Sequence, residues 1–306
     1  MNKLAGIIKV IRVNQWIKNL SLYAAIIFTA NLFTPVFFLA TTYGFFVFCA
    51  LSSASYVFND LVDAPYDRNH PRKRFRPIAM GTLSIQEAMI IFFILATLGL
   101  SVAYFLGIGF FLISTLFFLL HIGYTLWLKK HAILDIIAIA SSFLTRVFAG
   151  EAITGLHIPI WLTFSVIFLS LFIASCKRRS ELVAVGNKTR PALEHYRAQL
   201  LDFYNSTFAT GTIITYAMFT FQAQAPDFNP LIHDFLLFVF PQALGRKWLM
   251  VSTLPLIVVG IMRYAQLIYE REAVGESPEK LVTTDKPLIA TIALWGFSVI
   301  LFTYIL

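Results

Sequence analysis

Three aspartates lie close together in the segment NDLVDAPYDRNHPRKRFRP, where Asp63 follows Asp60 by three residues and Asp67 follows Asp63 by four. On a helix, residues at these spacings share one face, so the three carboxylates would lie one above another. Like charges placed in this way repel unless something positive lies between them. Mg2+ prefers oxygen ligands and binds through a few carboxylates together with the phosphates of a substrate. The three aspartates, called the acidic motif below, therefore predict a magnesium site.

A basic run follows the acidic motif directly. Arginine binds phosphate oxygens through paired hydrogen bonds, and lysine supplies a compact positive charge. Acidic residues followed by basic ones suit a metal–diphosphate complex, and Asn59 adds an amide that can orient or donate to a phosphate oxygen. Two plainer interpretations remain, namely a solvated helix end where each aspartate pairs with a neighbouring arginine, and a basic surface facing anionic lipid. The candidate phosphate-binding residues of this run are Arg68, Lys73, Arg74 and Arg76.

Two further groups of polar residues extend the candidate site. Asp135 and Arg146 lie eleven residues apart inside an apolar stretch, which is about three helical turns and places them on one face. Ionisable residues inside a membrane span are costly and are functional candidates by default. Lys18 adds a positive charge from the first apolar segment. The segment CKRRSELVAVGNKTRPALEHY contributes the candidates Lys177, Arg178, Glu181, Arg190 and Tyr196.

The chain around these residues is too apolar for a soluble protein. Of its 306 residues, 58% are hydrophobic and 13% are charged, and the mean hydropathy is +0.75. A soluble globular domain carries about 25% charged residues, so we expect the bilayer to be the solvent. The net charge of +8 is distributed over the connections between apolar segments, which argues against a nucleic-acid partner.

Nine apolar segments have the length of a membrane span, which predicts an all-α polytopic membrane protein with nine transmembrane helices. We number the connections between segments from the amino terminus and count the amino-terminal segment with the even ones. Outside the segments, the basic residues fall in the even-numbered connections, except for Arg246 and Lys247. The positive-inside rule therefore places the amino terminus in the cytoplasm. The nine segments are residues 19–33, 36–58, 84–106, 108–128, 133–150, 158–176, 203–222, 248–269 and 287–306.

The remaining segments complete one predicted domain over residues 1–306. Residues 1–18 alternate short apolar runs with basic residues, which predicts an amphipathic helix on the membrane surface. Residues 59–83 and 177–202 are predicted to be cytoplasmic active-site loops. We expect these two loops to face one another across a central cavity and to supply parts of one site.

The segment NDLVDAPYDRNHPRKRFRPIAMG resembles the first signature of the UbiA-type intramembrane prenyltransferases, with matches at Asn59, the acidic motif, Arg74, Arg76 and Pro77. The segments NQWIKNLSLYA, LDIIAIASSFLTRVFAGEAITG, CKRRSEL and GESPEKLVTTDKPL resemble one branch of that superfamily, the decaprenyl-phosphate phosphoribosyltransferases. The resemblance implies nine transmembrane helices around a central cavity, Mg2+ as cofactor, and a bacterial inner (cell) membrane with the active site facing the cytoplasm. It leaves the oligomeric state open, a homo-oligomer included.

One departure from the superfamily pattern points to the donor. The usual second acidic motif, Asp-x-x-x-Asp, is replaced by Lys177, Arg178 and Glu181. A donor with a diphosphate at one end and a monophosphate at the other fits this exchange, and 5-phosphoribosyl 1-diphosphate is such a molecule. The resemblance then implies Mg2+-dependent transfer of its phosphoribosyl group to a polyprenyl phosphate, with the acidic motif and Asn59 as the catalytic residues.

Two other functions remain as alternatives. The first is an ordinary UbiA-type prenyltransferase, which would move an isoprenoid chain from a prenyl diphosphate to an aromatic acceptor with the same fold and metal. The second is a membrane transporter with a binding site near the midplane of the bilayer. The concentration of charge at one predicted membrane face favours an enzyme that joins a soluble donor to a lipid acceptor.

Overall fold

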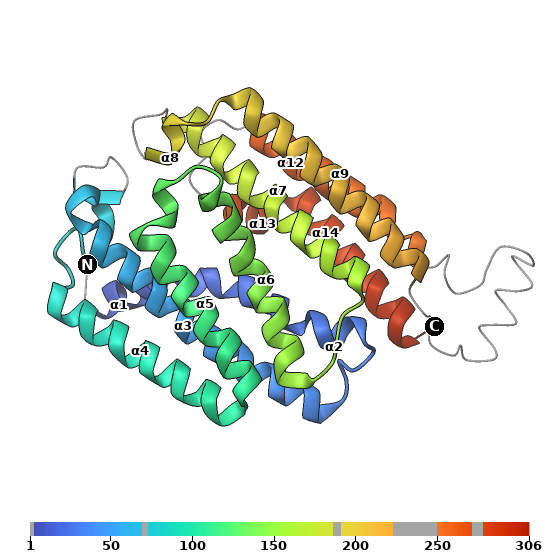
Figure 1. Cartoon of the computed structure of the whole chain (residues 1–306), viewed down its shortest axis with the longest axis horizontal. Helices are drawn as coiled ribbons and strands as arrows, with labels where there is room; N and C mark the ends of the chain where they lie inside the picture. Colours follow the sequence, from blue (N-terminus) through green and yellow to red (C-terminus); the bar gives the residue numbers. More distant parts are fainter. Residues whose placement is uncertain (1–2, 69–72, 186–190, 223–249, 271–277, 306) are drawn as a thin grey trace, which may run out of the picture. The chain divides into compact units, whose positions relative to one another are not determined.

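The computed structural model describes residues 3–68, 73–185, 191–222, 250–270 and 278–305, and every regular element in these ranges is a helix. The chain divides into two compact units, Met1–His157 and Ile158–Leu306 (Figure 1). The first unit contains α1 (Lys3–Ile11), the 3-10 helix η1 (Val13–Tyr23), α2 (Ala24–Phe28), α3 (Pro35–Asp67), η2 (Lys73–Phe75), α4 (Ile85–Leu106), α5 (Ile108–Leu126), η3 (Leu128–Lys130) and α6 (Leu134–Thr154). The second contains α7 (Ile160–Val185), α8 (Pro191–Glu194), α9 (Ala198–Gln222), α12 (Leu254–Glu270), α13 (Pro278–Thr284), α14 (Lys286–Ile300) and η6 (Leu301–Ile305).

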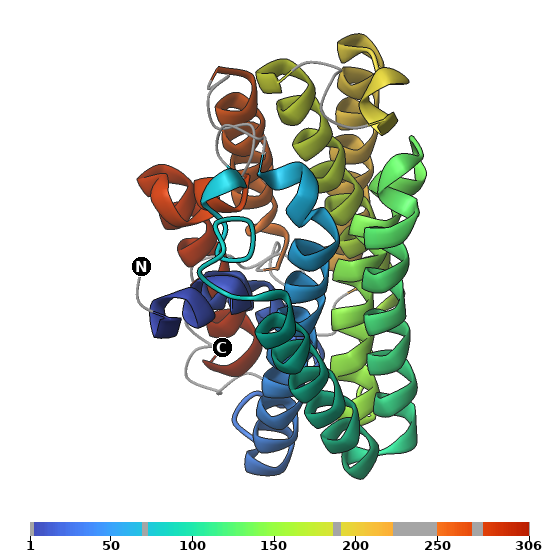
Figure 2. The ribbon, with the colours of Figure 1, turned by 90° about the vertical axis from the view of Figure 1, so that its left-hand side faces the viewer.

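Helix α3 organises the first unit. It begins with Pro35 in the first turn, where a missing N–H costs nothing, and it packs against α4, α5, α6 and η1 (Figures 1 and 2). Its Phe48 ring lies 4.7 Å from Phe117 of α5, centroid to centroid, within a buried apolar core. Thirty-three residues make a helix about 50 Å long, whereas the hydrocarbon layer is about 30 Å thick. The carboxyl end of α3, which carries the acidic motif, can therefore extend past the apolar layer.

The amino-terminal segment forms two different helices. The predicted amphipathic helix is present as α1, whose buried Gly6 and Val10 mark the side that faces the unit. It ends at Ile11 because Arg12 takes a left-handed backbone conformation, with φ of 53°. The chain then continues as η1 and α2, so the expected span at 19–33 is a 3-10 helix followed by a five-residue α-helix. Hydropathy detects the apolar character of this stretch but not its helix type.

Gly150 explains how η1 can lie so close to α6. A Cβ atom at this position would lie 2.0 Å from the carbonyl oxygen of Leu22, which is a backbone atom and cannot rotate away. The absence of a side chain on Gly150 thus permits the contact between these two helices. This contact positions Asn19 and Lys18 beside α6.

Replacing Gly150 with alanine is therefore expected to be strongly destabilising. The added methyl group must push η1 away from α6, which we expect to lower the free energy of unfolding by about 3 kcal/mol. Thermal unfolding of the purified protein in detergent would measure the loss. The control is Gly109→Ala in α5, where a Cβ atom would meet nothing within 4 Å. Equal melting temperatures for the two variants would contradict the tight η1–α6 contact.

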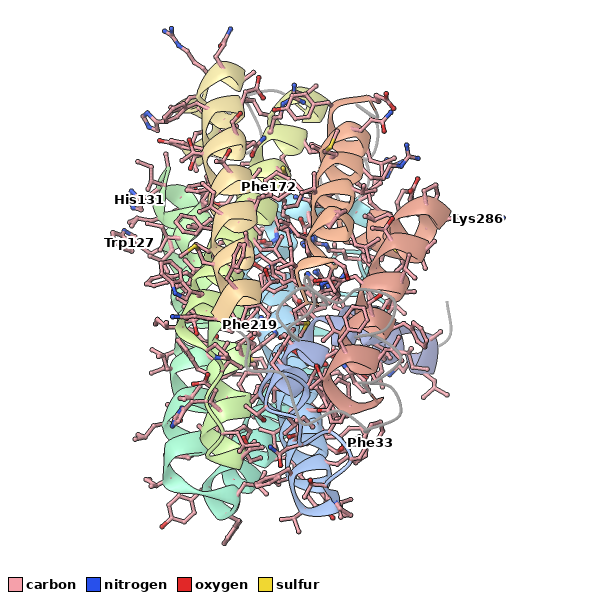
Figure 3. All side chains as sticks on the ribbon, turned by 90° about the vertical axis from the view of Figure 1, so that its right-hand side faces the viewer. Phe33, Trp127, His131, Phe172, Phe219 and Lys286 are labelled. Atoms are coloured by element: carbon pink, nitrogen blue, oxygen red, sulfur yellow. The ribbon has the colours of Figure 1, made fainter. Side chains whose placement is uncertain are left out.

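The second unit is built on the pair α7 and α9, which run side by side (Figure 1). Its buried core contains Phe172 of α7, labelled in Figure 3, together with Tyr264 and Leu267 of α12. The rings of Phe172 and Tyr264 are 5.8 Å apart, centroid to centroid. Leu281 of α13 and Leu288 of α14 close the same core. The last turns of α7 extend beyond this core and carry the second group of candidate site residues.

Six described helices are long and apolar enough to cross a membrane: Pro35–Asp67, Ile85–Leu106, Ile108–Leu126, Leu134–Thr154, Ile160–Val183 and Lys286–Tyr304. They correspond to six of the nine predicted spans. The other three are residues 19–33, which form η1 and α2; 203–222, which lie in α9; and 248–269, which begin outside the described residues and continue into α12. The count of nine and the cytoplasmic amino terminus stay predictions.

The outer surface of the first unit fits an integral membrane protein. Large apolar side chains are exposed along α4 and α5, including Phe93, Phe105 and Leu112. Trp127 and His131 lie together at the edge of this unit in Figure 3, with ring centroids 4.5 Å apart. Tryptophan is enriched where a membrane protein meets the headgroup region. The pair follows the carboxyl end of α5, near Lys129, and is consistent with a membrane boundary there.

Candidate active site

The acidic motif lies on the last turns of α3, as its spacing predicts. Asn59 and all three aspartates belong to this helix, so the shared helical face is confirmed. The side chains of Asp60 and Asp67 are 2% and 6% exposed, and that of Asp63 is 25% exposed. Residues 59–67 of the predicted loop at 59–83 are thus helical, and residues 69–72 lie outside the described part of the chain. Two buried carboxylates of this kind require positive partners.

Two arginines supply positive charge to Asp60 and Asp67. Nη2 of Arg12 donates to Oδ1 of Asp60 at 2.5 Å. Nη1 of Arg76 lies 3.1 Å from the same Asp60 oxygen and 2.6 Å from Oδ2 of Asp67. A single guanidinium nitrogen therefore bridges two carboxylates that are two helical turns apart on α3.

Asp63 has a different cation. Nζ of Lys129 in η3 donates to Oδ1 of Asp63 at 2.6 Å and to Oδ1 of Asn59 at 3.4 Å. Asn59 in turn donates to Oδ2 of Asp63 at 3.1 Å. The hydroxyl group of Thr125, near the end of α5, donates to the Asn59 oxygen at 3.4 Å. Asn59 is thus held beside the acidic motif, as predicted, and it links the motif to the α5–α6 connection.

The ligand atoms at this site are of the kind that Mg2+ prefers, but each carboxylate forms an ion pair with a cationic side chain. Three carboxylates and one amide oxygen on one helix face are the hard oxygen ligands that Mg2+ takes. Within the described ranges, however, no three His, Cys, Asp or Glu side chains are grouped as metal ligands. The interpretation that aspartates pair with basic residues is correct in kind. The partners differ from that expectation, because Arg12 and Lys129 come from 48 and 66 residues away in the sequence.

The other members of the basic run surround the motif less closely. Arg68 directly follows α3 and is exposed. Lys73 is half-buried in η2, and the guanidinium of exposed Arg74 lies 4.9 Å from the centre of the Phe75 ring. Arg76 is the member of the run whose guanidinium reaches both Asp60 and Asp67.

Arg146 lies deeper in the same unit and holds η1 against α6. Its side chain is 2% exposed, and its Nε donates to Oδ1 of Asn19 at 2.8 Å. Its Nη1 donates to the carbonyl oxygen and the hydroxyl of Ser142, the latter at 2.7 Å. The guanidinium also lies 4.7 Å from the centre of the Phe117 ring. Lys18, next to Asn19, is half-buried.

Asp135 lies in the first turn of the helix that carries Arg146. Both residues are buried on α6, which confirms that they occupy one helix three turns apart. The carboxylate of Asp135 accepts from the backbone N–H of Ile136 at 2.9 Å. A carboxylate in the first turn is favoured by the positive end of the helix dipole, so part of the role of Asp135 is to stabilise the start of α6.

The second charged group lies at the carboxyl end of α7. Arg178 pairs with Glu181 one turn further on, and the Arg178 side chain is 0% exposed. Lys177 is half-buried beside it, and Tyr196, which follows α8, is 2% exposed. Arg190 lies outside the described residues. The segment 177–202 therefore starts as helix and places Lys177, Arg178 and Glu181 within one turn, as predicted.

The contacts of Arg179, which also lies on α7, were not predicted from the sequence. Asp202 of α9 accepts from Nε of Arg179 at 2.6 Å and from the hydroxyl of Tyr269 at 2.6 Å. The Arg179 guanidinium lies 3.5 Å from the centre of the Tyr269 ring. These contacts join α7, α9 and α12 directly after Arg178. They fix the turn that carries the Arg178–Glu181 pair.

Two residues of the first unit were also missed as site residues. In the sequence, Arg12 and Lys129 belong to basic stretches that indicate only which side of the membrane each connection faces. The one available signal was their position in connections predicted on the same side as the acidic motif. That signal applies equally to the neighbouring Lys9 and Lys130, and therefore could not select them.

The sequence is similar to those of known proteins over nearly its whole length. The profile of the UbiA prenyltransferase family matches residues 20–280. The decaprenyl-phosphate phosphoribosyltransferase of Corynebacterium glutamicum is 30% identical over 310 residues, covering 98% of this chain and 87% of that protein. The enzyme of the same name from Mycolicibacterium smegmatis is 31% identical over 302 residues, covering 96% of this chain and 91% of that protein.

Solved structures give the same fold. A UbiA homolog from Archaeoglobus fulgidus bound to GPP and Mg2+ superposes with a TM-score of 0.71 and 21% sequence identity, covering 96% of this chain and 99% of that one. An identity this low supports the fold alone, but the family profile spans most of the chain. The protein therefore belongs to the UbiA prenyltransferase family.

Proposed function

We propose that this protein transfers the 5-phosphoribosyl group of 5-phosphoribosyl 1-diphosphate to a polyprenyl phosphate and releases diphosphate. The observation that carries the choice of donor is the basic turn of α7, where Lys177 and buried Arg178 stand with a single carboxylate, Glu181. A second metal–diphosphate site would need carboxylates there, whereas a monophosphate needs cations. The relatives named decaprenyl-phosphate phosphoribosyltransferase support the same choice.

The acidic motif and Asn59 are proposed to hold Mg2+ on the diphosphate of the donor. Bound there, Mg2+ would neutralise the charge that builds on the departing diphosphate. Arg68, Lys73, Arg74 and Arg76 add positive charge near the same leaving group, where cations stabilise a transition state more than the substrate. The Mg2+ in the solved A. fulgidus homolog supports a metal in this fold.

The acceptor needs little activation. A polyprenyl phosphate is already anionic near neutral pH, so its oxygen can attack the anomeric carbon without a strong general base. Attack from the face opposite the leaving diphosphate inverts the configuration at that carbon. Asp135 and Arg146 are proposed to lie deeper in the site, where Arg146 or Lys18 meets the lipid phosphate. The isoprenoid tail would lie among apolar helices, where each buried methylene contributes about 0.8 kcal/mol.

The 5-phosphate of the donor is assigned to the second charged group. Lys177, Arg178 and Arg190 are proposed to bind its oxygens, Glu181 to orient the ribose or the metal, and Tyr196 to line the same region. Buried Arg178 is the strongest candidate because a guanidinium shielded from water interacts more strongly with a phosphate than an exposed one.

The membrane arrangement completes the proposal. We infer one UbiA-like domain over residues 1–306, with nine transmembrane helices around a central cavity and a cytoplasmic amino terminus. The protein would lie in the bacterial inner membrane with its active site facing the cytoplasm, where a soluble phosphorylated sugar is available. A homo-oligomer is compatible with this arrangement and is not required by it.

A product assay tests the function directly. Purified protein in detergent would receive 5-phosphoribosyl 1-diphosphate, polyprenyl phosphates of several lengths and Mg2+, and mass spectrometry would detect phosphoribosyl lipid and diphosphate. Chelation with EDTA is expected to abolish the product, and excess Mg2+ to restore it. Folded protein that makes no product from any lipid length, yet joins a prenyl diphosphate to an aromatic acceptor, would establish ordinary prenyl transfer instead. Movement of unchanged substrate across sealed vesicles would establish a transporter.

A further inference from the structure

Three cations from three separate segments surround the acidic motif. Arg12 comes from the junction of α1 and η1, Arg76 follows η2, and Lys129 belongs to η3. Each makes an ion pair of 2.6 Å or less with a motif carboxylate. The bridging position of Arg76 between Asp60 and Asp67 is one that a divalent cation commonly takes between carboxylates.

The carboxylates of this cluster are compensated without any bound ion. Each of the three carboxylates pairs with a cationic side chain, and Lys73 adds positive charge near Asp67, so a divalent ion arriving alone would bring two more positive charges to carboxylates that are already compensated. It would also have to displace the cations from oxygens that it needs as ligands. A metal that arrives with a diphosphate brings anionic oxygens to which the displaced cations can turn. The exchange then leaves every charge paired, which buried charges require.

The exposure of the partners permits such an exchange. The side chains of Arg12, Arg76 and Lys129 are 27%, 23% and 14% exposed. All three thus reach solvent, whereas Asp60 and Asp67 are nearly fully buried. Long cationic side chains can swing by rotation about their own bonds, while the carboxylates are fixed to α3.

We propose that Arg12 and Lys129, together with Arg76, are exchangeable counterions of the acidic motif. Each holds a carboxylate until the metal–diphosphate end of the donor arrives, and then binds an oxygen of the diphosphate. This inference rests on the proposed function for the identity of the donor. It adds Arg12 and Lys129 to the residues that bind the leaving group, and it predicts that metal and diphosphate bind together rather than one after the other.

Arg12 has a backbone suited to a controlled test. Its φ of 53° lies in the left-handed region, which is uncommon for residues other than glycine, asparagine and aspartate. Asparagine tolerates that conformation, so Arg12→Asn removes the cation and keeps the turn between α1 and η1. Lys129→Gln removes the second cation. Lys130→Gln is the matched control, because exposed Lys130 is the next residue in the same η3 turn.

The experiment compares two titrations on the full-length protein in detergent. The first follows Mn2+ alone by electron paramagnetic resonance, and the second follows inorganic diphosphate in saturating Mg2+ by calorimetry. Removing a counterion leaves a carboxylate with less positive charge beside it, so Arg12→Asn and Lys129→Gln are each expected to bind Mn2+ about fivefold more tightly. Each is also expected to bind Mg2+–diphosphate about tenfold more weakly, because a ligand of the diphosphate is lost. Lys130→Gln should match the unaltered protein in both titrations.

The exchange predicts that the affinities for Mn2+ and for Mg2+–diphosphate change in opposite directions. Weaker binding of both Mn2+ and Mg2+–diphosphate in each variant would mean that these cations only hold the carboxylates in place, which overturns the exchange. Unchanged binding in both titrations would overturn it as well, as would no Mn2+ binding by any form of the protein. If the opposite shifts appear but no phosphoribosyl lipid forms in the product assay, the exchange stands and the phosphoribosyl donor is wrong.

Discussion

Replacing Asp60 with asparagine is expected to lower the rate of phosphoribosyl transfer by about a thousandfold, because Asp60 is the most buried carboxylate of the acidic motif. Asparagine keeps the size of the side chain but removes the charge that a metal requires. In the unaltered protein Arg12 and Arg76 both pair with the Asp60 carboxylate, whereas in the variant they face a neutral amide. The rate of product formation at saturating donor and Mg2+ measures the effect.

Asp63→Asn provides an independent second variant. Asp63 pairs with Lys129 rather than with the two arginines, so a purely local collapse around Arg12 would not be shared by both variants. Both should lose most of their activity if the metal needs the whole motif. Raising the Mg2+ concentration should restore part of the activity, because the remaining ligands can still bind the ion, although with lower affinity.

Glu87→Gln is the matched control for the loss of a carboxylate. Glu87 lies in the first turn of α4, where it pairs with Lys3 at 2.7 Å on the surface. Exposed pairs of this kind contribute little to stability, so this variant should keep its activity. Melting temperatures of all three variants would separate lost chemistry from lost folding. Retention of more than about a tenth of the activity by Asp60→Asn would contradict a metal role.

The local parts of the site were predictable from the sequence. Helical periodicity depends on residues within two turns, and it correctly placed Asp60, Asp63 and Asp67 on one face of α3. The same holds for Arg178 and Glu181, which lie three residues apart and form an ion pair on α7. In both cases the spacing along one helix fixed the geometry, and nothing else in the fold was needed.

The partners of the motif were not predictable because they depend on packing between distant segments. Arg12 reaches Asp60 only because α1 packs on α3, and Lys129 reaches Asp63 only because α5 ends beside it. The close approach of η1 to α6 likewise depends on Gly150, which lies far from η1 in the sequence. Hydropathy records that residues 19–33 are apolar, but it carries no information about these contacts.

Arg178→Lys is expected to reduce catalytic efficiency with 5-phosphoribosyl 1-diphosphate by roughly tenfold to 150-fold, since a hydrogen bond to a charged group contributes about 1.5–3 kcal/mol. Lysine keeps the charge but loses the planar fork that binds phosphate oxygens in pairs. The variant also keeps a cation beside Glu181, so this partly buried carboxylate keeps a positive neighbour. The assay compares kcat/KM for two donors, with and without the 5-phosphate.

The second donor, ribose 1-diphosphate, makes the assignment specific. If Arg178 binds the 5-phosphate, the substitution removes an interaction that this shorter donor never makes, so the variant and the unaltered enzyme should use it equally well. The matched control is Arg179→Lys, because Arg179 packs on Tyr269 and pairs with Asp202. Any loss in that variant should be the same for both donors, as expected for a residue that only positions α7. An Arg178→Lys variant that lost the same factor with both donors would place the 5-phosphate elsewhere, and Lys177 would become the first residue to test.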